Sequence, residues 1–254
     1  MPDKGPEFHV KLVDSDSELR AAQALRYDVF VRELSGTGPL IDHEAGIEAD
    51  WFDPFFDHMI ATDTTTGQVI GVYRLLREDQ ARRAGRFYSE DEYDLTVLRQ
   101  SGRHLLELGR SCVHPDYRGG IAMYHLWLGL AAYVADHNID VLFGVASFHG
   151  THIDALAQPL SYLHAAHLAP PELRVRAQSD HYQRMDLLPL DQIDRHRAMV
   201  ETPALIKAYL RLGGCVGDGA FVDHGFNTTD VFLVVDTAQM NARQKRLYTA
   251  PRLA

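Results

Sequence analysis

The chain has 254 residues, of which 46% are hydrophobic and 24% are charged, a composition typical of a folded globular protein with a substantial core. Acidic residues outnumber basic ones by 35 to 25, and the net charge of −10 disfavours nucleic acid as a partner, because phosphate attraction dominates such binding. Two cysteines, Cys112 and Cys215, are too few for a disulfide framework or a four-ligand zinc site, so we expect a cytoplasmic protein without a bound metal.

The pattern of apolar residues predicts alternating helices and strands. Helices are predicted where apolar residues recur every three or four positions, and strands where they alternate or form short buried runs. In chain order the predicted elements are a helix from Ser15 or Ser17 to about residue 34, a long acidic and aromatic loop at 35–56, hairpin strands at 57–62 and 69–76, a mostly exposed excursion at 77–103, a strand at 105–113, a buried helix at 121–137, a strand at 141–146, helices at 151–168 and 202–212, and a strand at 231–235. We expect one domain over 1–254, in which a C-terminal part from about 171 completes the sheet of a core at about 8–170.

The segment from Glu107 to Gly120 predicts a phosphate-binding turn. A strand leads into Arg118-Gly119-Gly120 and then into a helix, so backbone NH groups and the helix dipole are available to a phosphate. This order resembles the pyrophosphate-binding turn of the GNAT superfamily, but it is one residue shorter. The shortening is compatible with a donor whose phosphate is the phosphopantetheine of a carrier protein. An ordinary tight turn is the alternative interpretation.

Glu107 and Arg110 are the candidate catalytic residues of this strand. In regular pleating they point to opposite faces, whereas a bulge near Gly109 would bring them to one face and free a backbone NH for a thioester oxyanion. An amine that attacks a thioester must lose a proton, and Glu107 is the candidate base, worth about 10²- to 10⁴-fold in rate. The alternative is that both residues form exposed ion pairs.

Several motifs together resemble the L-ornithine N(alpha)-acyltransferase family over nearly the whole chain, and acyl-homoserine-lactone synthases more weakly. The motifs are Leu25-Arg-Tyr-Asp-Val-Phe30, Phe52-Asp-Pro-Phe-Phe-Asp-His58, Tyr73-Arg-Leu-Leu76, Glu107-Leu-Gly-Arg-Ser111, Ser147-Phe-His-Gly-Thr151 and the helix from Pro203 to Gly213. The resemblance implies an α/β, GNAT-like fold with a mixed central sheet flanked by helices. It also implies transfer of a 3-hydroxyacyl chain from acyl carrier protein to the α-amino group of L-ornithine, giving lyso-ornithine lipid, with no tightly bound cofactor.

The same resemblance implies the residues of the site. The polar floor consists of Arg26, Phe30, Asp57, Arg74, Glu107 and Arg110, with Glu107, Arg110 and Asp57 in catalytic roles. Asp53 and Asp57 receive the cationic acceptor, and Arg74 or Arg110 takes its carboxylate. Asp53 precedes Pro54 and is otherwise a turn former. Ser147 and His149 follow a buried strand at the end where α/β folds place ligands, although His149 is equally compatible with a solvated loop.

An acidic carrier protein requires a positive patch on its partner. Three clusters are candidates, although each is also compatible with merely solvated charges: Arg82 with Arg83 and Arg86, Arg174 with Arg176, and Arg243 with Lys245 and Arg246. The acyl chain needs an apolar slot, which the predicted buried helix would line if its side chains are not simply core: Met123, Leu126, Trp127 and Leu130.

Two other functions and a membrane association remain open. One alternative is lactone synthesis from S-adenosylmethionine, disfavoured because that resemblance is confined to the N-terminal half. The other is a non-catalytic, lipid-binding or haemolysin-like protein, for which no pore-forming amphipathic segment is found. No apolar run reaches the roughly 20 residues that span a bilayer, and residues 1–10 lack the apolar region of a secretory signal. Because the expected product is a lipid, peripheral contact with the inner membrane is compatible with a cytoplasmic location.

Overall fold

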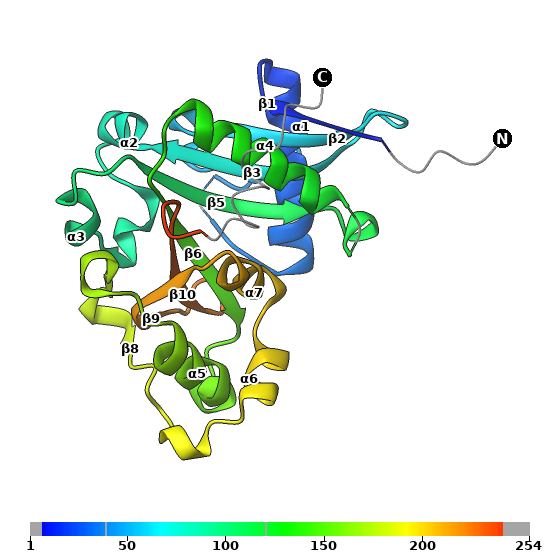
Figure 1. Ribbon diagram of the computed structural model, residues 1–254. Coiled ribbons are helices and arrows are strands. Elements are labelled where there is room, and N and C mark those ends of the chain that lie inside the picture. Colours follow the sequence, from blue (N-terminus) through cyan, green and yellow to red (C-terminus); the bar gives the residue numbers. More distant parts are fainter. Residues whose placement is uncertain (1–6, 39, 120, 241–254) are drawn as a thin grey trace. The chain divides into compact units, whose positions relative to one another are not determined.

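The computed structural model describes residues 7–38, 40–119 and 121–240 (Figure 1). Their contacts divide these residues into two compact units. The first unit contains 7–85 and 108–138, and the second contains 86–107 and 139–240. This division differs from the predicted one near residue 170, because the segment 86–107 packs with the C-terminal part of the chain.

The first unit is built on antiparallel strands. Strand β1 (Phe8–Leu12) pairs with β2 (Asp57–Asp63), and β2 pairs with β3 (Val69–Arg77), which confirms the predicted hairpin. The last residues of β5 (Leu105–Val113) lie next to β3. Strand β1 was not predicted; its alternation extends over only five residues and includes His9 and Lys11.

Helices α1 (Asp16–Arg26) and α4 (Ala122–Asp136) cover opposite faces of these strands. On one face, Ala22 and Leu25 of α1 pack against Val72. On the other face, a Cβ atom added at Gly71 would come within 2.7 Å of Leu126 in α4. Because successive residues of a strand point to opposite faces, Val72 and Gly71 mark the two sides of β3.

Local signals explain where α1 begins and how it continues. The Ser15 side chain accepts a hydrogen bond from the amide of Glu18, as expected of a helix cap. The predicted helix to about residue 34 is confirmed as an extended helical segment, but Tyr27–Glu33 adopt a wider π-helical turn. Such turns are frequent at functional sites, and this one carries Phe30.

The second unit contains a mixed sheet. Strand β6 (Val141–His149) is parallel to the first residues of β5 and antiparallel to β10 (Thr228–Asp236). Beyond β10 lies β9 (Cys215–Asp223), an unpredicted strand whose glycines weaken the sequence signal. The sheet also includes the short strands β4 (Tyr93–Asp94), β7 (Arg176–Ala177) and β8 (Tyr182–Gln183).

The excursion after β3 was predicted to be mostly exposed, and this prediction is wrong for its second half. Phe87 and Tyr93 are fully buried. The rings of Phe87 and Phe143 lie 5.1 Å apart in an edge contact, and Phe143 stacks on Phe232 at 5.5 Å. These aromatic contacts anchor the segment 86–95 against β6 and β10.

The remaining helices are short. They are α2 (Glu78–Ala84), α3 (Thr96–Arg99), α5 (Ala157–His167), α6 (Arg195–Glu201) and α7 (Ala204–Arg211), together with a 3₁₀ turn at Tyr88–Asp91. Among the residues that the structure describes, no helix combines the length and apolar character needed to cross a membrane.

Replacing Gly219 by alanine is expected to lower the free energy of unfolding by about 2–4 kcal/mol. Gly219 has φ of +82°, and an added Cβ would lie 2.2 Å from a ring carbon of Tyr182, so backbone strain and a steric clash act together. Gly102 is the control, because its φ of +68° carries the strain but no atom lies within 4 Å of the added Cβ. Equal losses in urea unfolding for the two variants would contradict this expectation.

Candidate active site

A closed ring of alternating charges occupies one face of the first unit. Its arginines come from the end of α1, from β3 and from β5, and its carboxylates come from the loop before β2. The members, in order around the ring, are Arg26, Asp53, Arg74, Asp50, Arg110 and Glu48.

Asp53 is the centre of the buried half of this ring. Its Oδ1 accepts hydrogen bonds from Nη1 of Arg26 at 2.8 Å and from Nη1 of Arg74 at 2.7 Å. Its Oδ2 accepts from the Gln23 amide at 2.9 Å. Both arginines are fully buried, and Arg26 also donates through Nε to Glu48. Asp53 is therefore saturated by protein donors, which differs from the direct contact with the acceptor that we predicted.

Arg110 closes the ring and is its most exposed arginine, at 19% of its side-chain surface. Its Nε donates to Oε1 of Glu48 at 3.1 Å, and its Nη2 lies 3.9 Å from Oδ2 of Asp50. The same guanidinium lies 5.7 Å from the centre of the Phe30 ring. The structure thus brings together four predicted site residues, Arg26, Phe30, Arg74 and Arg110, around a carboxylate triad.

The backbone at Arg110 is irregular. Its φ is +47°, a left-handed conformation that is rare for a residue other than glycine inside a strand. This conformation interrupts the pleat of β5 directly after Gly109, where the sequence led us to expect a bulge.

The ring holds its carboxylates in the ionised form. Burial opposes ionisation of Asp53, but Arg26 and Arg74 outweigh that effect and lower its pKa to about 2. Burial likewise opposes ionisation of Glu48, and Arg110 and Arg26 reverse it, so the pKa of Glu48 is also lowered. Three arginines balance three carboxylates, and the ring as a whole offers little net charge to a cationic substrate.

Asp57 lies away from this ring, contrary to the shared polar floor that we predicted. His58 pairs with Arg74 across the hairpin, so His58 and Arg74 share one face and Asp57 points to the other. There its Oδ2 accepts from Nη1 of Arg77 at 2.6 Å and from the Tyr133 hydroxyl of α4 at 2.5 Å. Strand parity separates Asp57 from the ring.

His58 and the loop carboxylates were not among the predicted site residues. His58 is buried, and its Nε2 lies 3.0 Å from the carbonyl oxygen of Asp53. Burial lowers the pKa of this imidazole, which favours its neutral form. Glu48 and Asp50 belong to the acidic loop that the sequence marked as functional, but their arginine partners are distant in sequence and no spacing rule identifies them.

Glu107 belongs to the second unit, where it is 2% exposed. Its Oε2 accepts the amide of Tyr88 and its Oε1 accepts the amide of Ser89, both at 2.7 Å. The carboxylate therefore caps the 3₁₀ turn at Tyr88–Asp91. Each carboxylate oxygen has a second lone-pair direction, so the two amides do not exhaust its capacity to accept a proton.

The predicted phosphate turn has a left-handed glycine and a paired arginine. Gly119 has φ of +74°, and Gly120 lies outside the described residues. Arg118 donates from Nη1 and Nη2 to the two carboxylate oxygens of Glu33 at 2.6 Å each, and from Nε to the carbonyl of Val113. A phosphate at this turn would have to displace Glu33 to reach the guanidinium.

Ser147 and His149 lie within β6 and not in the loop after it. The strand extends to His149, where it pairs with Thr228, and Ser147 pairs with Asp230. Both side chains are exposed. The sequence ended this strand at 146 because alternating exposed residues replace the continuous apolar run.

Most arginines of the proposed basic clusters have acidic partners. Arg82 pairs with Glu78, Arg86 with Asp91 and Arg176 with Asp218. The cluster of Arg243, Lys245 and Arg246 lies outside the described residues. Within the described ranges, no group of three histidine, cysteine, aspartate or glutamate side chains is arranged to hold a metal ion.

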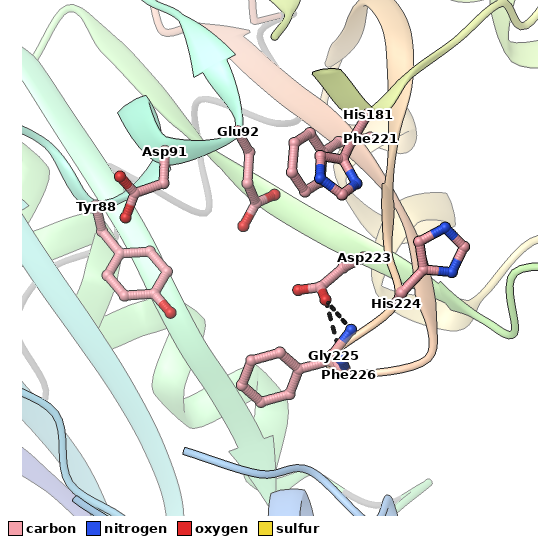
Figure 2. Close-up of a pocket in the computed structure, with 9 residues that line it drawn as sticks. All are labelled: Tyr88, Asp91, Glu92, His181, Phe221, Asp223, His224, Gly225 and Phe226. Carbon is pink, nitrogen blue, oxygen red and sulfur yellow. Dashed lines mark hydrogen bonds between the residues drawn. The ribbon is translucent and has the colours of Figure 1, made fainter. Parts of the chain in front are cut away.

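A pocket of about 330 Å³ in the second unit was not predicted (Figure 2). Its lining comes from the 3₁₀ turn after Phe87, from the segment before β8 and from the hairpin between β9 and β10. The residues are Tyr88, Asp91, Glu92, His181, Phe221, Asp223, His224, Gly225 and Phe226. Because these segments are far apart in sequence, only the folded chain brings their acidic and aromatic side chains together.

Comparisons with known proteins identify relatives along almost the whole chain. A family model described as an acetyltransferase (GNAT) domain matches residues 25–128. The chain is 57% identical to the L-ornithine N(alpha)-acyltransferase of Rhodobacter capsulatus over 95% of each protein. It is 43% identical to the enzyme of the same name from Brucella abortus, over 96% of this chain and 89% of that protein.

A solved structure supports the fold. The CoA-dependent acyl-homoserine lactone synthase BjaI matches with a TM-score of 0.51 at 14% identity, over 96% of this chain and 88% of that one. With the GNAT match, this likeness confirms the predicted α/β, GNAT-like fold with a mixed sheet and flanking helices. The sequence identities to the two full-length relatives confirm the predicted family: the chain belongs to the L-ornithine N(alpha)-acyltransferases.

Proposed function

We propose that this acyltransferase moves a 3-hydroxyacyl chain from the thioester of acyl carrier protein to the α-amino group of L-ornithine, giving lyso-ornithine lipid. The observation that carries the proposal is the 57% identity, over 95% of both chains, to a protein named L-ornithine N(alpha)-acyltransferase. The buried Glu107 carboxylate on β5, the strand that leads to the glycine turn, supports it. We also propose a cytoplasmic location with peripheral contact at the inner membrane, where a lipid product would partition.

In the proposed reaction, Glu107 is the base. The neutral α-amine attacks the thioester carbon, a C–N bond forms, and the C–S bond breaks as the tetrahedral intermediate collapses. The proton of the amine passes to Glu107, directly or through one water, and the departing thiolate takes a proton from solvent. The amides of Tyr88 and Ser89 fix the carboxylate, so little reorganisation is needed when the amine arrives.

The other predicted residues have supporting roles in this proposal. Arg110 is the only partly exposed arginine of the ring, so we assign it, and not the fully buried Arg74, to the ornithine carboxylate. Phe30 flanks its guanidinium. Arg26, Arg74 and Asp53 position the loop and Arg110 through the ring. Asp57 positions β2 against α4 through Tyr133. Ser147 and His149 remain proposed substrate contacts at the end of β6.

The donor end of the site is proposed at the turn before α4. A phosphopantetheine phosphate would meet the NH groups at Gly119 and Gly120 and the guanidinium of Arg118. The α4 side chains that face the core would border the acyl chain: Met123, Leu126, Trp127 and Leu130. Acyl carrier protein is the proposed macromolecular partner.

The proposal is tested with purified protein and two donors. The same 3-hydroxyacyl group is supplied on acyl carrier protein or on coenzyme A, with L-ornithine as acceptor, and the product is identified by mass. The expected result is N(alpha)-3-hydroxyacyl ornithine, formed with the higher kcat/KM from the carrier protein. Acyl-ornithine formed faster from coenzyme A would overturn the donor assignment alone, and no acyl-ornithine from either donor would overturn the proposed reaction.

A further inference from the structure

The acceptor in the proposed function carries a second cation, the ammonium at the end of its side chain. The carboxylates of the ring are already bound to arginines, and Asp57 is bound to Arg77 and Tyr133. A cationic side chain therefore needs carboxylates that are not neutralised in this way. The pocket of the second unit supplies them.

Two of the three acidic residues in the pocket have no arginine at salt-bridge distance. Asp91 pairs with Arg86 at 2.6 Å, whereas Glu92 and Asp223 appear in no ion pair of the described residues. Oδ1 of Asp223 accepts the amides of Gly225 and Phe226, at 2.7 and 3.0 Å, which fixes its carboxylate at the hairpin. Figure 2 shows the carboxylates of Glu92 and Asp223 pointing into the same space.

Aromatic rings form the rest of the pocket wall. Tyr88, Phe221 and Phe226 contribute rings, and His181 lies 5.0 Å from Phe221 and donates to or accepts from the Val222 carbonyl region through Nδ1, at 3.0 Å from its oxygen. Aromatic faces attract an ammonium group, and their apolar surface suits the methylene groups that precede it. The volume of about 330 Å³ is at the small end of the range for ligand pockets, as expected for part of an amino acid.

The pocket is connected to the proposed base through one turn of chain. The side chain of Tyr88 lines the pocket, and its amide donates to Glu107. The next residue, Ser89, is fully buried, and its Oγ has no hydrogen-bond partner among the described residues. A buried hydroxyl without a partner costs about 1–3 kcal/mol, so a polar ligand atom or a water near it is expected when the site is occupied.

We infer that this pocket binds the cationic side chain of the amino acid acceptor, with Glu92 and Asp223 as the carboxylates that select an ammonium group. The inference rests on the proposed function. It assigns the selection of ornithine to the second unit, on the same turn that holds Glu107, and it separates selection of the side chain from the arginine ring.

The test compares L-ornithine with L-norvaline, which has the same carbon chain without the ammonium group. In the Glu92→Gln and Asp223→Asn variants, KM for ornithine is expected to rise about 10- to 100-fold while the KM for norvaline stays unchanged. Asn at 223 retains an oxygen for the two hairpin amides, so the fold is preserved. Asp154→Asn removes an exposed charge in the same unit and is the matched control.

Binding is measured separately from turnover. Ornithine, and not norvaline, is expected to shift the imidazole NMR signals of His181 and His224 in the wild-type protein. Unchanged ornithine KM in both variants, with acyl-ornithine still formed, would overturn the pocket and leave the proposed reaction intact. Selective imidazole shifts without acyl-ornithine formation would support the pocket and overturn the reaction. Absence of any ornithine-specific shift would overturn the pocket.

Discussion

Replacing Glu107 by alanine is expected to lower kcat for acyl transfer to ornithine by about 10²- to 10⁴-fold. The substitution removes the carboxylate that is proposed to take the proton of the amine, while the pocket and the arginine ring keep their own side chains. Glu172→Ala, which removes an exposed acid from the same unit, is the control and should retain wild-type turnover. Initial rates at saturating acceptor measure the effect.

The same substitution also removes the acceptor of the Tyr88 and Ser89 amides, so a structural loss must be distinguished from a chemical one. Hydroxylamine is uncharged at neutral pH and needs less help from a base than an ammonium group. The variant should therefore lose much less activity towards hydroxylamine than towards ornithine. Its deficit with ornithine should also narrow as the pH rises, because solvent then deprotonates the amine. Equal losses with both acceptors at every pH would assign Glu107 a purely structural role.

The secondary structure was predictable wherever one signal dominated. Strand β5 was predicted with the bounds that the structure has, because it is a continuous apolar run that ends before the turn at His114. Strand β9 was missed, since Gly217 and Gly219 interrupt its pattern. The burial of Phe87 was missed for a different reason: its partners Phe143 and Phe232 are distant in sequence, and no local pattern reports them.

The site was predictable as a set of residues but not as an arrangement. Motif resemblance identified Arg26, Arg74 and Arg110, and the structure places all three in one ring. It did not reveal that strand parity sends Asp57 to the opposite face, which requires the pairing of His58 with Arg74. The pocket could not be predicted at all, because it depends on how three separate segments fold together.

The second large effect is expected on stability. Replacing Asp53 by asparagine should lower the free energy of unfolding by about 3–5 kcal/mol, because Arg26 and Arg74 are fully buried and lose the charge that they share. Asparagine has nearly the same shape, so no cavity forms. Its amide nitrogen would face a donor from Gln23 or from an arginine, which adds an unmade hydrogen bond.

This loss should depend on pH in a defined direction. The pKa of Asp53 is about 2 in the folded protein, below the ordinary value of 3.8, so its charge stabilises the fold above about pH 4. The contribution disappears as the pH falls from about 4 towards 2, where the protonated aspartic acid resembles asparagine. The difference in unfolding free energy between the wild type and Asp53→Asn should therefore shrink by about 2 kcal/mol over this interval.

An exposed ion pair of the same unit provides the comparison. Asp28 accepts from Arg32 at 2.7 Å, but the two side chains are 45% and 67% exposed, so Asp28→Asn should cost less than about 1 kcal/mol at any pH. Urea unfolding of both variants between pH 2 and pH 7 measures the contrast. If Asp53→Asn cost no more than Asp28→Asn, the ring would not be a stabilising frame. Arg110 would then have to be held at the site by Phe30 and its left-handed backbone alone.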